Sequence, residues 1–356
     1  MRPPTIASEN SDKIRAKAAM TEPKKPRILL VSTGGTITMV ANGEGTLSPC
    51  DDADKLLSLV PEIRTLADVD VLPLVNLDSA NLQPDLWLSL SQTIYERMSS
   101  YDGFVVTHGT DTLAFTAAAL SFILQELPKP VVITGAQVPL GDIGSDGRSN
   151  LINAFRVAVL DIAEVVVVFG SQVIRGTRAK KTSAFDLQAF SSVNSPPIGT
   201  IGLSILLQGG HRNRSRRKPL LRNFLSQDVA MISVYPGLKP DIIDFLASKH
   251  RGIVIEGYGS GNIPTEGVAS LCPAIAAATA RKVAVVVCTQ CMVGSTEMEL
   301  YQVGRAALKA GAIPAMDMTP ETSLVKLMWV LGQTNDLSTV ESMMQKAVAG
   351  EVHEIQ

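Results

Sequence analysis

The chain has 356 residues, of which 46% are hydrophobic and 19% charged, and its formal net charge at pH 7 is -2. This length predicts two domains, or one large one, with enough apolar material for a core. The small net charge and a pI of about 6.1 argue against a nucleic-acid-binding protein, which needs a strongly basic face. No apolar run is long enough to cross a membrane. The low charged fraction favours an oligomer that buries part of its surface.

The first 26 residues contain prolines and charges but lack the hydrophobic segment of a secretory signal. We expect residues 1–26 to form a disordered leader and the protein to reside in the cytoplasm. Four cysteines, Cys50, Cys272, Cys288 and Cys291, are too few for a disulfide framework in a chain of this length. Cys288 and Cys291 match C-x-x-C, but Cys288 ends an apolar run, which favours buried thiols over a redox or zinc site.

Apolar runs alternate with helix-like segments along the first half of the chain. In the segment that begins at Pro84, for example, Leu86, Leu90 and Ile94 fall on one helical face. Strands that are apolar throughout and alternate with such helices predict a parallel sheet covered on both faces. We expect a larger, doubly wound N-terminal domain of the flavodoxin or Rossmann type over residues 27–207. The other expected helices follow Asp111 and Arg148, and the expected strands are Ile28–Ser32, Val69–Val75, Gly103–Thr107, Val131–Thr134 and Val165–Phe169.

The pattern breaks at residues 208–223, which read QGGHRNRSRRKPLLRN. This basic segment is short and lacks aromatic residues, so we interpret it as a solvated interdomain linker rather than a nucleic-acid patch. A second α/β pattern follows, which predicts a smaller C-terminal α/β domain over residues 224–356. Its expected strands are Val229–Val234, Gly252–Glu256 and Val283–Cys288, with helices after Pro240, Thr265, Thr296, Thr319 and Leu337.

Two of the expected strands end in small, hydroxyl-rich loops. STGGTI at 32–37 follows the first strand, and THGTDT at 107–112 follows the third. Small molecules bind at the carboxyl ends of strands in α/β sheets, and paired glycines let a backbone come close to a ligand. Either loop alone is also typical of a βα turn whose hydroxyls cap a helix. Together, the two loops are expected to face one another across a crevice.

A threonine nucleophile needs an activating group. Of the four histidines only His108 lies near one of these loops, and the absence of a G-x-S-x-G elbow argues against a Ser-His-Asp hydrolase. A lysine can serve when its surroundings lower its basicity. The candidates are Lys180 and Lys181, in the segment after the fifth strand. Nucleotide binding is disfavoured, because neither G-x-G-x-x-G after the first strand nor a Walker A motif occurs.

The chain contains four motifs in this order: STGGTI (32–37), THGTDT (107–112), ITGAQVP with SDGRSN (133–139 and 145–150) and YGSGNIP (258–264). Together they resemble the bacterial-type L-asparaginase/glutaminase family, and the similarity extends from about Arg27 to Leu331. The segments 78–87 and 317–332 are most similar to its type I, cytosolic branch. The resemblance implies an amidohydrolase that converts L-asparagine to L-aspartate and ammonia through an acyl-enzyme on threonine, with no metal or cofactor. It also implies a homodimer or homotetramer with the active site near a subunit interface, and it leaves minor glutaminase activity open.

The resemblance implies catalytic roles for four residues. Thr36 matches the family's first threonine, which is its proposed covalent nucleophile. Thr110 and Asp111 match the second catalytic threonine and its neighbouring aspartate, and Lys181 matches the lysine that completes that group. Whether Thr36 or Thr110 is the nucleophile remains open at this point.

Three further residues are implied in substrate binding. Asp78 and Ser79 match the segment that holds the α-carboxylate and α-amino group of the substrate. Asn262 matches an asparagine that a neighbouring subunit contributes in the family. Asp111 is an anion suited to the α-ammonium group of the substrate. Asp111 and Thr110 are therefore expected to bind the substrate in addition to their catalytic roles.

One segment departs from the family. There, a tyrosine on the loop after TGGTI closes over the substrate, whereas residues 39–49 here read MVANGEGTLSP, with Thr46 at the corresponding position. Either Thr46 or another group replaces the tyrosine, or Thr110 is the primary nucleophile, or activity on asparagine is weak. Two alternatives follow: a regulatory protein that binds asparagine or aspartate, and the ammonia-releasing subunit of a tRNA-dependent amidotransferase. The second should carry an additional N-terminal domain, for which a leader of 26 residues is too short.

Overall fold

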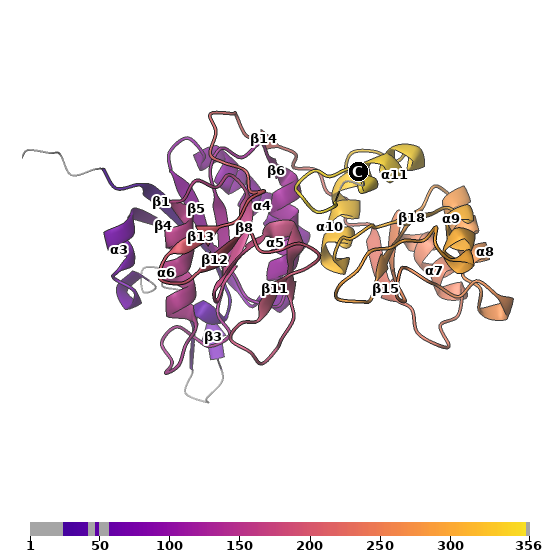
Figure 1. The fold of residues 1–356 in the computed structure, drawn as a ribbon, viewed down its shortest axis with the longest axis horizontal. Helices are drawn as coiled ribbons and strands as arrows, with labels where there is room; N and C mark the ends of the chain where they lie inside the picture. Colours follow the sequence, from indigo (N-terminus) through magenta and orange to yellow (C-terminus); the bar gives the residue numbers. More distant parts are fainter. Residues whose placement is uncertain (1–23, 42–46, 50–56, 354–356) are drawn as a thin grey trace, which may run out of the picture.

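The structure, a computed structural model, describes residues 24–41, 47–49 and 57–353. It consists of a larger unit from the first part of the chain and a smaller unit from the last part, with α10 (Pro320–Leu331) between them (Figure 1). Each unit contains a β-sheet with helices packed against it. The predicted α/β architecture, with the larger unit first, is confirmed.

The larger unit is built on an eight-stranded sheet in the order β13-β12-β9-β8-β7-β5-β1-β4. The five strands from β4 to β8 in this order are parallel, and they are the five strands predicted from sequence. Three antiparallel strands that the sequence did not predict extend the sheet beyond β8. The bounds are β1 Arg27–Gly34, β4 Asp68–Leu77, β5 Gly103–Thr107, β7 Val131–Thr134, β8 Val165–Phe169, β9 Gln172–Arg175, β12 Gly199–Ile201 and β13 Ile205–Leu207.

Helices cover both faces of the parallel part of this sheet. Alternate residues of β1 point to opposite faces, so Ile28 and Leu30 pack with α3 and α6, whereas Leu29 and Val31 pack with α4 and α5. This two-sided burial explains the apolar runs in β1, β5, β7 and β8. The edge strand β4 has no fully buried residue and carries the polar residues Asp68, Asp70 and Asn76. The helices are α3 Ile63–Leu66, α4 Pro84–Arg97, α5 Leu113–Ile123 and α6 Gly147–Ala158.

Helix α5 differs from its predicted one-sided pattern, because ten of its 11 residues are buried. It lies between the large sheet and α10, and the rings of Phe122 and Trp329 stack across that contact with their centroids 5.8 Å apart. A helix that is apolar on all sides is buried on all sides. The helix that follows the THGTDT loop is therefore the central element of the contact between the two units.

The smaller unit has a four-stranded parallel sheet in the order β15-β16-β17-β18. Helices α7, α8 and α9 pack on one face, and α10 and α11 on the other. Strand β18 was not predicted, and α8 and α9 begin later than expected because turns follow Thr265 and Thr296. The bounds are β15 Val229–Ser233, α7 Asp241–Lys249, β16 Gly252–Gly257, α8 Cys272–Ala280, β17 Ala284–Thr289, α9 Gln302–Lys309, β18 Ala312–Pro314 and α11 Leu337–Gln345.

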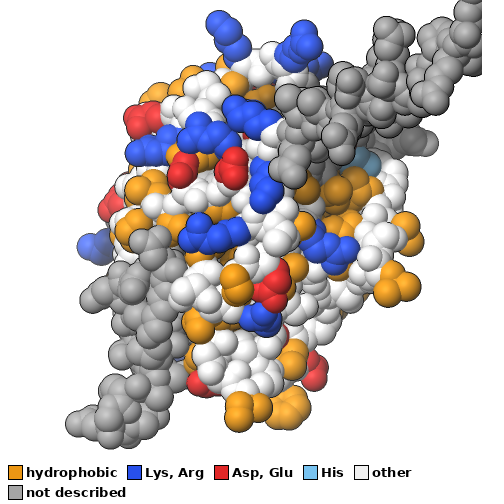
Figure 2. Space-filling model, turned by 90° about the vertical axis from the view of Figure 1, so that its left-hand side faces the viewer, with side chains coloured by type: hydrophobic (Ala, Val, Ile, Leu, Met, Phe, Trp, Pro, Cys, Tyr) orange, Lys and Arg blue, Asp and Glu red, His pale blue; other side chains and the backbone are white. Residues whose placement is uncertain are grey.

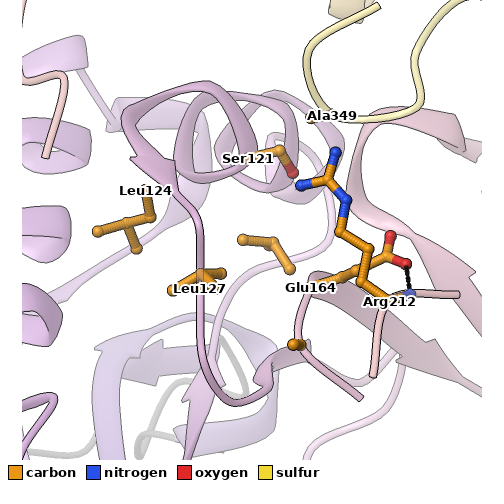
Figure 3. A pocket seen from close by; sticks show the side chains of 8 residues that line it. Ser121, Leu124, Leu127, Glu164, Arg212 and Ala349 are labelled. Atoms are coloured by element: carbon orange, nitrogen blue, oxygen red, sulfur yellow. Dashed lines mark hydrogen bonds between the residues drawn. The ribbon is translucent and has the colours of Figure 1, made fainter. Parts of the chain in front are cut away.

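The segment 208–223 crosses the edge of the large sheet at which β7 and β8 begin. Arg214 donates hydrogen bonds to the carbonyls of Ala158 and Leu160, and β14 (Leu220–Leu221) pairs with β6 (Leu124–Gln125). A cavity of about 20 Å³ lies beneath Arg212 and Ala349 (Figure 3), which is enough for roughly one water molecule. This edge is opposite the edge that carries the two threonine loops.

Candidate active site

The two threonine loops lie where the strand order of the large sheet reverses. Strand β1 has β4 on one side and β5 on the other, and the chain then continues away from β5 through β7 and β8. In such sheets a crevice forms at the carboxyl ends of the two strands at the reversal. Thr36 follows β1, in the short helix η1 (Thr36–Thr38), and Thr110 follows β5. Both threonines therefore belong to the site that the topology favours.

Glycines bring three loops into direct contact at this point. Gly35 has a φ of 83°, and a Cβ atom on it would overlap the backbone nitrogen of Gly109. A Cβ atom on Gly109 would in turn lie 2.5 Å from Ser79 Oγ. Because neither glycine has room for a side chain, the backbones meet, and Thr36 and Thr110 immediately follow that contact.

Lys181 joins Thr110 and Asp111 into one polar group. Its ammonium nitrogen lies 2.8 Å from Thr110 Oγ1 and 2.7 Å from Asp111 Oδ1. Thr110 is 6% exposed and the side chain of Asp111 is 60% exposed, so the group extends from the protein interior to solvent. An uncharged Lys181 amine could accept the Thr110 proton across the same short distance, which is the geometry that general-base catalysis requires.

The Thr110 hydroxyl has a second partner, Gln137. Thr110 Oγ1 donates to Gln137 Oε1 at 3.2 Å, while Lys181 donates to the same hydroxyl oxygen. A hydroxyl has one proton and two acceptor lone pairs, so in this state its proton points to Gln137 and a lone pair faces Lys181. Proton transfer to Lys181 therefore requires the hydroxyl of Thr110 to rotate away from Gln137.

Of the two candidate lysines, only Lys181 faces the threonine loops. Both lie on β10 (Ala179–Lys181), where consecutive side chains point to opposite faces. Lys180 points to Glu321 at the start of α10, with 2.8 Å between Nζ and Oε1. The alternation of the strand thus decides a choice that the residue pattern alone left open.

Residues 27–211 match the family described as "Asparaginase, N-terminal", and residues 228–344 match "Glutaminase/Asparaginase C-terminal domain". The chain belongs to the asparaginase family. The resemblance inferred from the four motifs is confirmed.

Curated relatives in this family carry two different names. One is a glutamyl-tRNA(Gln) amidotransferase subunit of Pyrococcus furiosus, which is 41% identical over 349 residues, or 94% of this chain and 79% of the relative. Another is the L-asparaginase of Thermococcus kodakarensis, which is 39% identical over 329 residues, or 92% of this chain and 99% of the relative.

Solved structures of asparaginases superpose on nearly the whole chain. The thermostable L-asparaginase from Thermococcus kodakarensis has a TM-score of 0.87 at 37% identity and covers 92% of this chain and 100% of its own. L-asparaginase I from Vibrio cholerae has a TM-score of 0.83 at 33% identity and covers 93% and 100%. The order of the two units and the arrangement of their sheets are therefore those of known asparaginases.

Asp78 and Ser79 lie beside the Thr110 loop, whereas Asn262 lies in the smaller unit. Asp78 caps the short helix η2 (Ser79–Asn81) by accepting a hydrogen bond from the Ala80 amide at 2.9 Å. Thr112 ties this loop to THGTDT by donating to the Ser79 carbonyl at 2.9 Å. The Asn262 side-chain oxygen is buried without a hydrogen-bond partner among the described residues. Thr46 lies outside the described residues.

His108 is a structural neighbour of the site rather than its base. Complete burial lowers the pKa of His108 to about 4, although a hydrogen bond to the Gly109 carbonyl acts in the opposite direction. Nδ1 lies 2.7 Å from that carbonyl, so it carries the proton, and Nε2 accepts from the Thr116 hydroxyl at 2.9 Å. Thr116 in turn accepts from the indole N–H of Trp87 at 2.9 Å. The neutral ring thus fixes the backbone just before Thr110.

The sequence did not identify two residues that contribute to the site, Gln137 and Asp146. The carboxylate of Asp146 accepts hydrogen bonds from the backbone amides of Gln137 and Val138, at 3.0 Å in each case. It thereby fixes the loop that brings the Gln137 side chain to Thr110. Both residues belong to motifs that carried the family resemblance, ITGAQVP and SDGRSN, but nothing in those motifs indicates their contact.

Among the described residues, no group of three or more histidine, cysteine, aspartate or glutamate side chains could hold a metal ion. Cys272, Cys288 and Cys291 are free thiols, and burial raises the pKa of Cys288 above its usual range.

No helix in the described ranges is long and apolar enough to span a membrane. Figure 2 shows the face of the larger unit turned away from the smaller one, where basic side chains are dispersed among acidic and apolar ones.

Proposed function

We propose that this protein is an L-asparaginase, which hydrolyses the side-chain amide of L-asparagine to L-aspartate and ammonia. The observation that carries the proposal is the contact of the Lys181 ammonium with both Thr110 Oγ1 and Asp111 Oδ1. The backbone contact of Gly35 with Gly109 supports it, because Thr36 directly follows one of these glycines and Thr110 the other. A second hydroxyl is thereby available beside the activated group.

In the proposed mechanism Thr36 Oγ1 attacks the amide carbon of the substrate. The C–N bond breaks, the proton from Thr36 leaves with the ammonia, and an ester forms between Thr36 and the aspartyl group. Water then cleaves this ester, giving its hydroxyl to aspartate and its proton to Thr36. Lys181 and Thr110 relay the protons, Asp111 holds the α-ammonium, and Ser79 with nearby backbone amides receives the α-carboxylate. Backbone N–H groups stabilise the negative charge that develops on the amide oxygen.

The purified chain tests this proposal directly. Incubation with L-asparagine should yield ammonia and aspartate in equal amounts, without added metal or cofactor. L-Glutamine should be a poorer substrate, since one extra methylene changes discrimination by about 1–3 kcal/mol. Mass spectrometry of the enzyme, quenched during turnover and digested, should find the aspartyl group on the peptide that contains Thr36. Its appearance on the Thr110 peptide instead would reverse the roles of the two threonines.

A second candidate function is ammonia supply within a tRNA-dependent amidotransferase. It is supported by the 41% identity to the glutamyl-tRNA(Gln) amidotransferase subunit of Pyrococcus furiosus. If it is correct, the isolated chain should release ammonia slowly until a partner subunit and charged tRNA are added.

A third possibility is a regulatory protein that only binds asparagine or aspartate. In that case calorimetry should detect ligand heat without continuing ammonia release.

We also propose that the protein assembles as a homodimer or homotetramer and that Asn262 completes the site of a neighbouring subunit. The side-chain oxygen of Asn262 supports this assignment, because it is buried and has no hydrogen-bond partner in the part of the chain that the structure describes. Light scattering should give a mass of two or four chains. Asn262→Ala should weaken the binding of asparagine without dissociating the assembly.

We also propose domain boundaries for the chain and the cellular compartment in which the protein resides. We propose a leader at residues 1–26, domains at 27–207 and 224–356, and a linker at 208–223. Limited proteolysis should cut first in the leader and leave the two domains intact. Fractionation of cells that express the full chain should recover it in the cytoplasm.

A further inference from the structure

The strand that carries Lys181 is also held from its opposite side. Strand β10 pairs with β11 (Phe190–Ser192) to form a two-stranded hairpin. Lys180, the middle residue of β10, binds Glu321 in the first turn of α10. Because consecutive strand residues point to opposite faces, the contact of Lys180 with Glu321 and that of Lys181 with Thr110 constrain the same strand from two sides.

Both strands of the hairpin are fixed to the last part of the chain at the open end of the hairpin. Arg178, just before β10, is 1% exposed, and it donates to the Asp317 carboxylate at 2.7 Å and to the Gly350 carbonyl at 2.9 Å. Asn194, two residues after β11, has a φ of 56°. Its side-chain nitrogen Nδ2 donates to the backbone carbonyls of Asp317 and Gly294, at 2.8 Å each. Both strands of the hairpin are therefore anchored at its open end, and the Lys180–Glu321 pair is the contact adjacent to Lys181.

Glu321 occupies a site that is poorly explained by stability alone. Its side chain is 16% exposed, and its Oε2 atom is buried without a hydrogen-bond partner among the described residues. A buried carboxylate oxygen without a partner costs free energy, which the N-terminus of α10 offsets only in part. Buried ion pairs are often no more stabilising than apolar side chains of similar volume. A role in placing Lys180 accounts for this carboxylate better than a role in stability.

We propose that Lys180 is a positioning residue for Lys181. Its ion pair with Glu321 fixes the rotation of β10 about its own axis and so keeps Lys181 Nζ on the Thr110 hydroxyl. The inference rests on the proposed function, in which Lys181 acts on Thr110. Helix α10 packs on α5 and on the sheet of the smaller unit, so the pair makes the geometry of the site depend on how that unit is docked.

Steady-state kinetics with L-asparagine test this inference on Lys180→Met, Glu321→Gln and the double variant. Each single variant should lose about 10- to 100-fold in kcat, because small displacements of reacting groups have effects of this size, while KM stays close to normal. The double variant should lose no more than either single variant, since all three remove the same pair. Lys180→Arg keeps the charge and can reach Glu321, so it should recover most of the kcat.

Arg217→Met is the matched control, because it removes an ion pair to Glu126 whose side chains are 73% and 41% exposed. It should change neither kcat nor KM. Thermal unfolding gives the folded fraction of each variant, and kcat is expressed per folded protein. A normal kcat in Lys180→Met, a rise in KM alone, additive losses in the double variant, or no recovery by Lys180→Arg would each overturn the inference.

Lys181→Met separates this inference from the proposed function. If the unaltered protein releases no ammonia from L-asparagine, the proposed function has failed. If Lys181→Met retains full activity, the function stands but the role of Lys181, and with it the positioning role of Lys180, has failed. If Lys181→Met is inactive while Lys180→Met has a normal kcat, only the positioning role has failed.

Discussion

Gly35 and Gly109 meet backbone to backbone, and no side chain fits at either position. Gly35 also has a φ of 83°, which an L-residue adopts only under strain. Gly35→Ala should therefore destabilise the fold by more than about 2 kcal/mol and abolish ammonia release, because the two threonine loops are forced apart. Urea unfolding and an ammonia assay measure the two effects.

Gly209→Ala is the control for this substitution. Gly209 is exposed in the 208–223 segment, and no atom lies within 4 Å of a Cβ atom placed there. This variant should keep its activity and stay within about 0.5 kcal/mol of the normal stability. Equal behaviour of the two variants would contradict the close contact at Gly35.

His108 should make the fold sensitive to mild acid. Its folded-state pKa of about 4 lies below the ordinary value of 6.5, so between these values the unfolded chain binds a proton that the folded protein does not. Stability is therefore complete above about pH 6.5, falls as the pH decreases, and at pH 5 is lower by about 2 kcal/mol from this residue. Urea unfolding at pH 7.5 and pH 5 measures the difference.

His108→Gln should flatten this pH dependence, although it lowers stability at both pH values because the contacts to Thr116 and Gly109 change. An unchanged slope in His108→Gln would show that the ring is not held neutral by burial.

Asp317→Asn should test the anchor at the start of β10. The carboxylate is the ion-pair partner of Arg178, whose side chain is 1% exposed. Removing the carboxylate should lower the free energy of unfolding by about 3–5 kcal/mol at pH 7, because the buried charge of Arg178 is left unpaired. Asp70→Asn is the control: its partner Arg27 is at a similar distance, 2.9 Å, but both side chains are about half exposed. The free energy of unfolding of Asp70→Asn should fall by no more than about 1 kcal/mol.

The cost of Asp317→Asn should also shrink in acid. Burial alone would raise the pKa of Asp317, but the hydrogen bond and charge of Arg178, together with His353, outweigh burial and lower it. A lowered folded-state pKa means that this stabilisation is present above about pH 4, the value of the unfolded chain, and is lost as the pH falls through the folded value. Unfolding curves at pH 7 and pH 3 compare the two proteins; a constant difference would contradict the role of the carboxylate.

The sequence predicted the parallel strands β1, β5, β7, β8, β16 and β17 well, because each contains a continuous apolar run that is buried. The parallel strand β18, with only three residues, was missed. The short antiparallel strands β9, β12 and β13 were missed, since three or four residues give no readable period. Helix α5 has an apolar face by spacing, yet its burial on all sides depends on α10, which is distant in sequence. The apolar composition of α5 on all sides does indicate that the helix is buried, but which distant element covers it leaves no local signal.

The same limit applies to the site. The family resemblance predicted Thr36, Thr110, Asp111 and Lys181, although local spacing by itself did not decide between Lys180 and Lys181. In the structure, consecutive residues of β10 point to opposite faces, so Lys181 contacts Thr110 and Lys180 contacts Glu321. The hydrogen bond from Thr110 to Gln137 joins two loops and was likewise invisible in sequence.

The most direct test of the central claim is ammonia release from L-asparagine by Thr36→Ala, Thr110→Val and Lys181→Met. Lys249→Met and Thr200→Val, at exposed positions, are the matched controls. We predict that each of the three loses at least about 100-fold in turnover with its thermal unfolding unchanged, while the controls keep normal rates. Near-normal ammonia release by all three variants would contradict the mechanism.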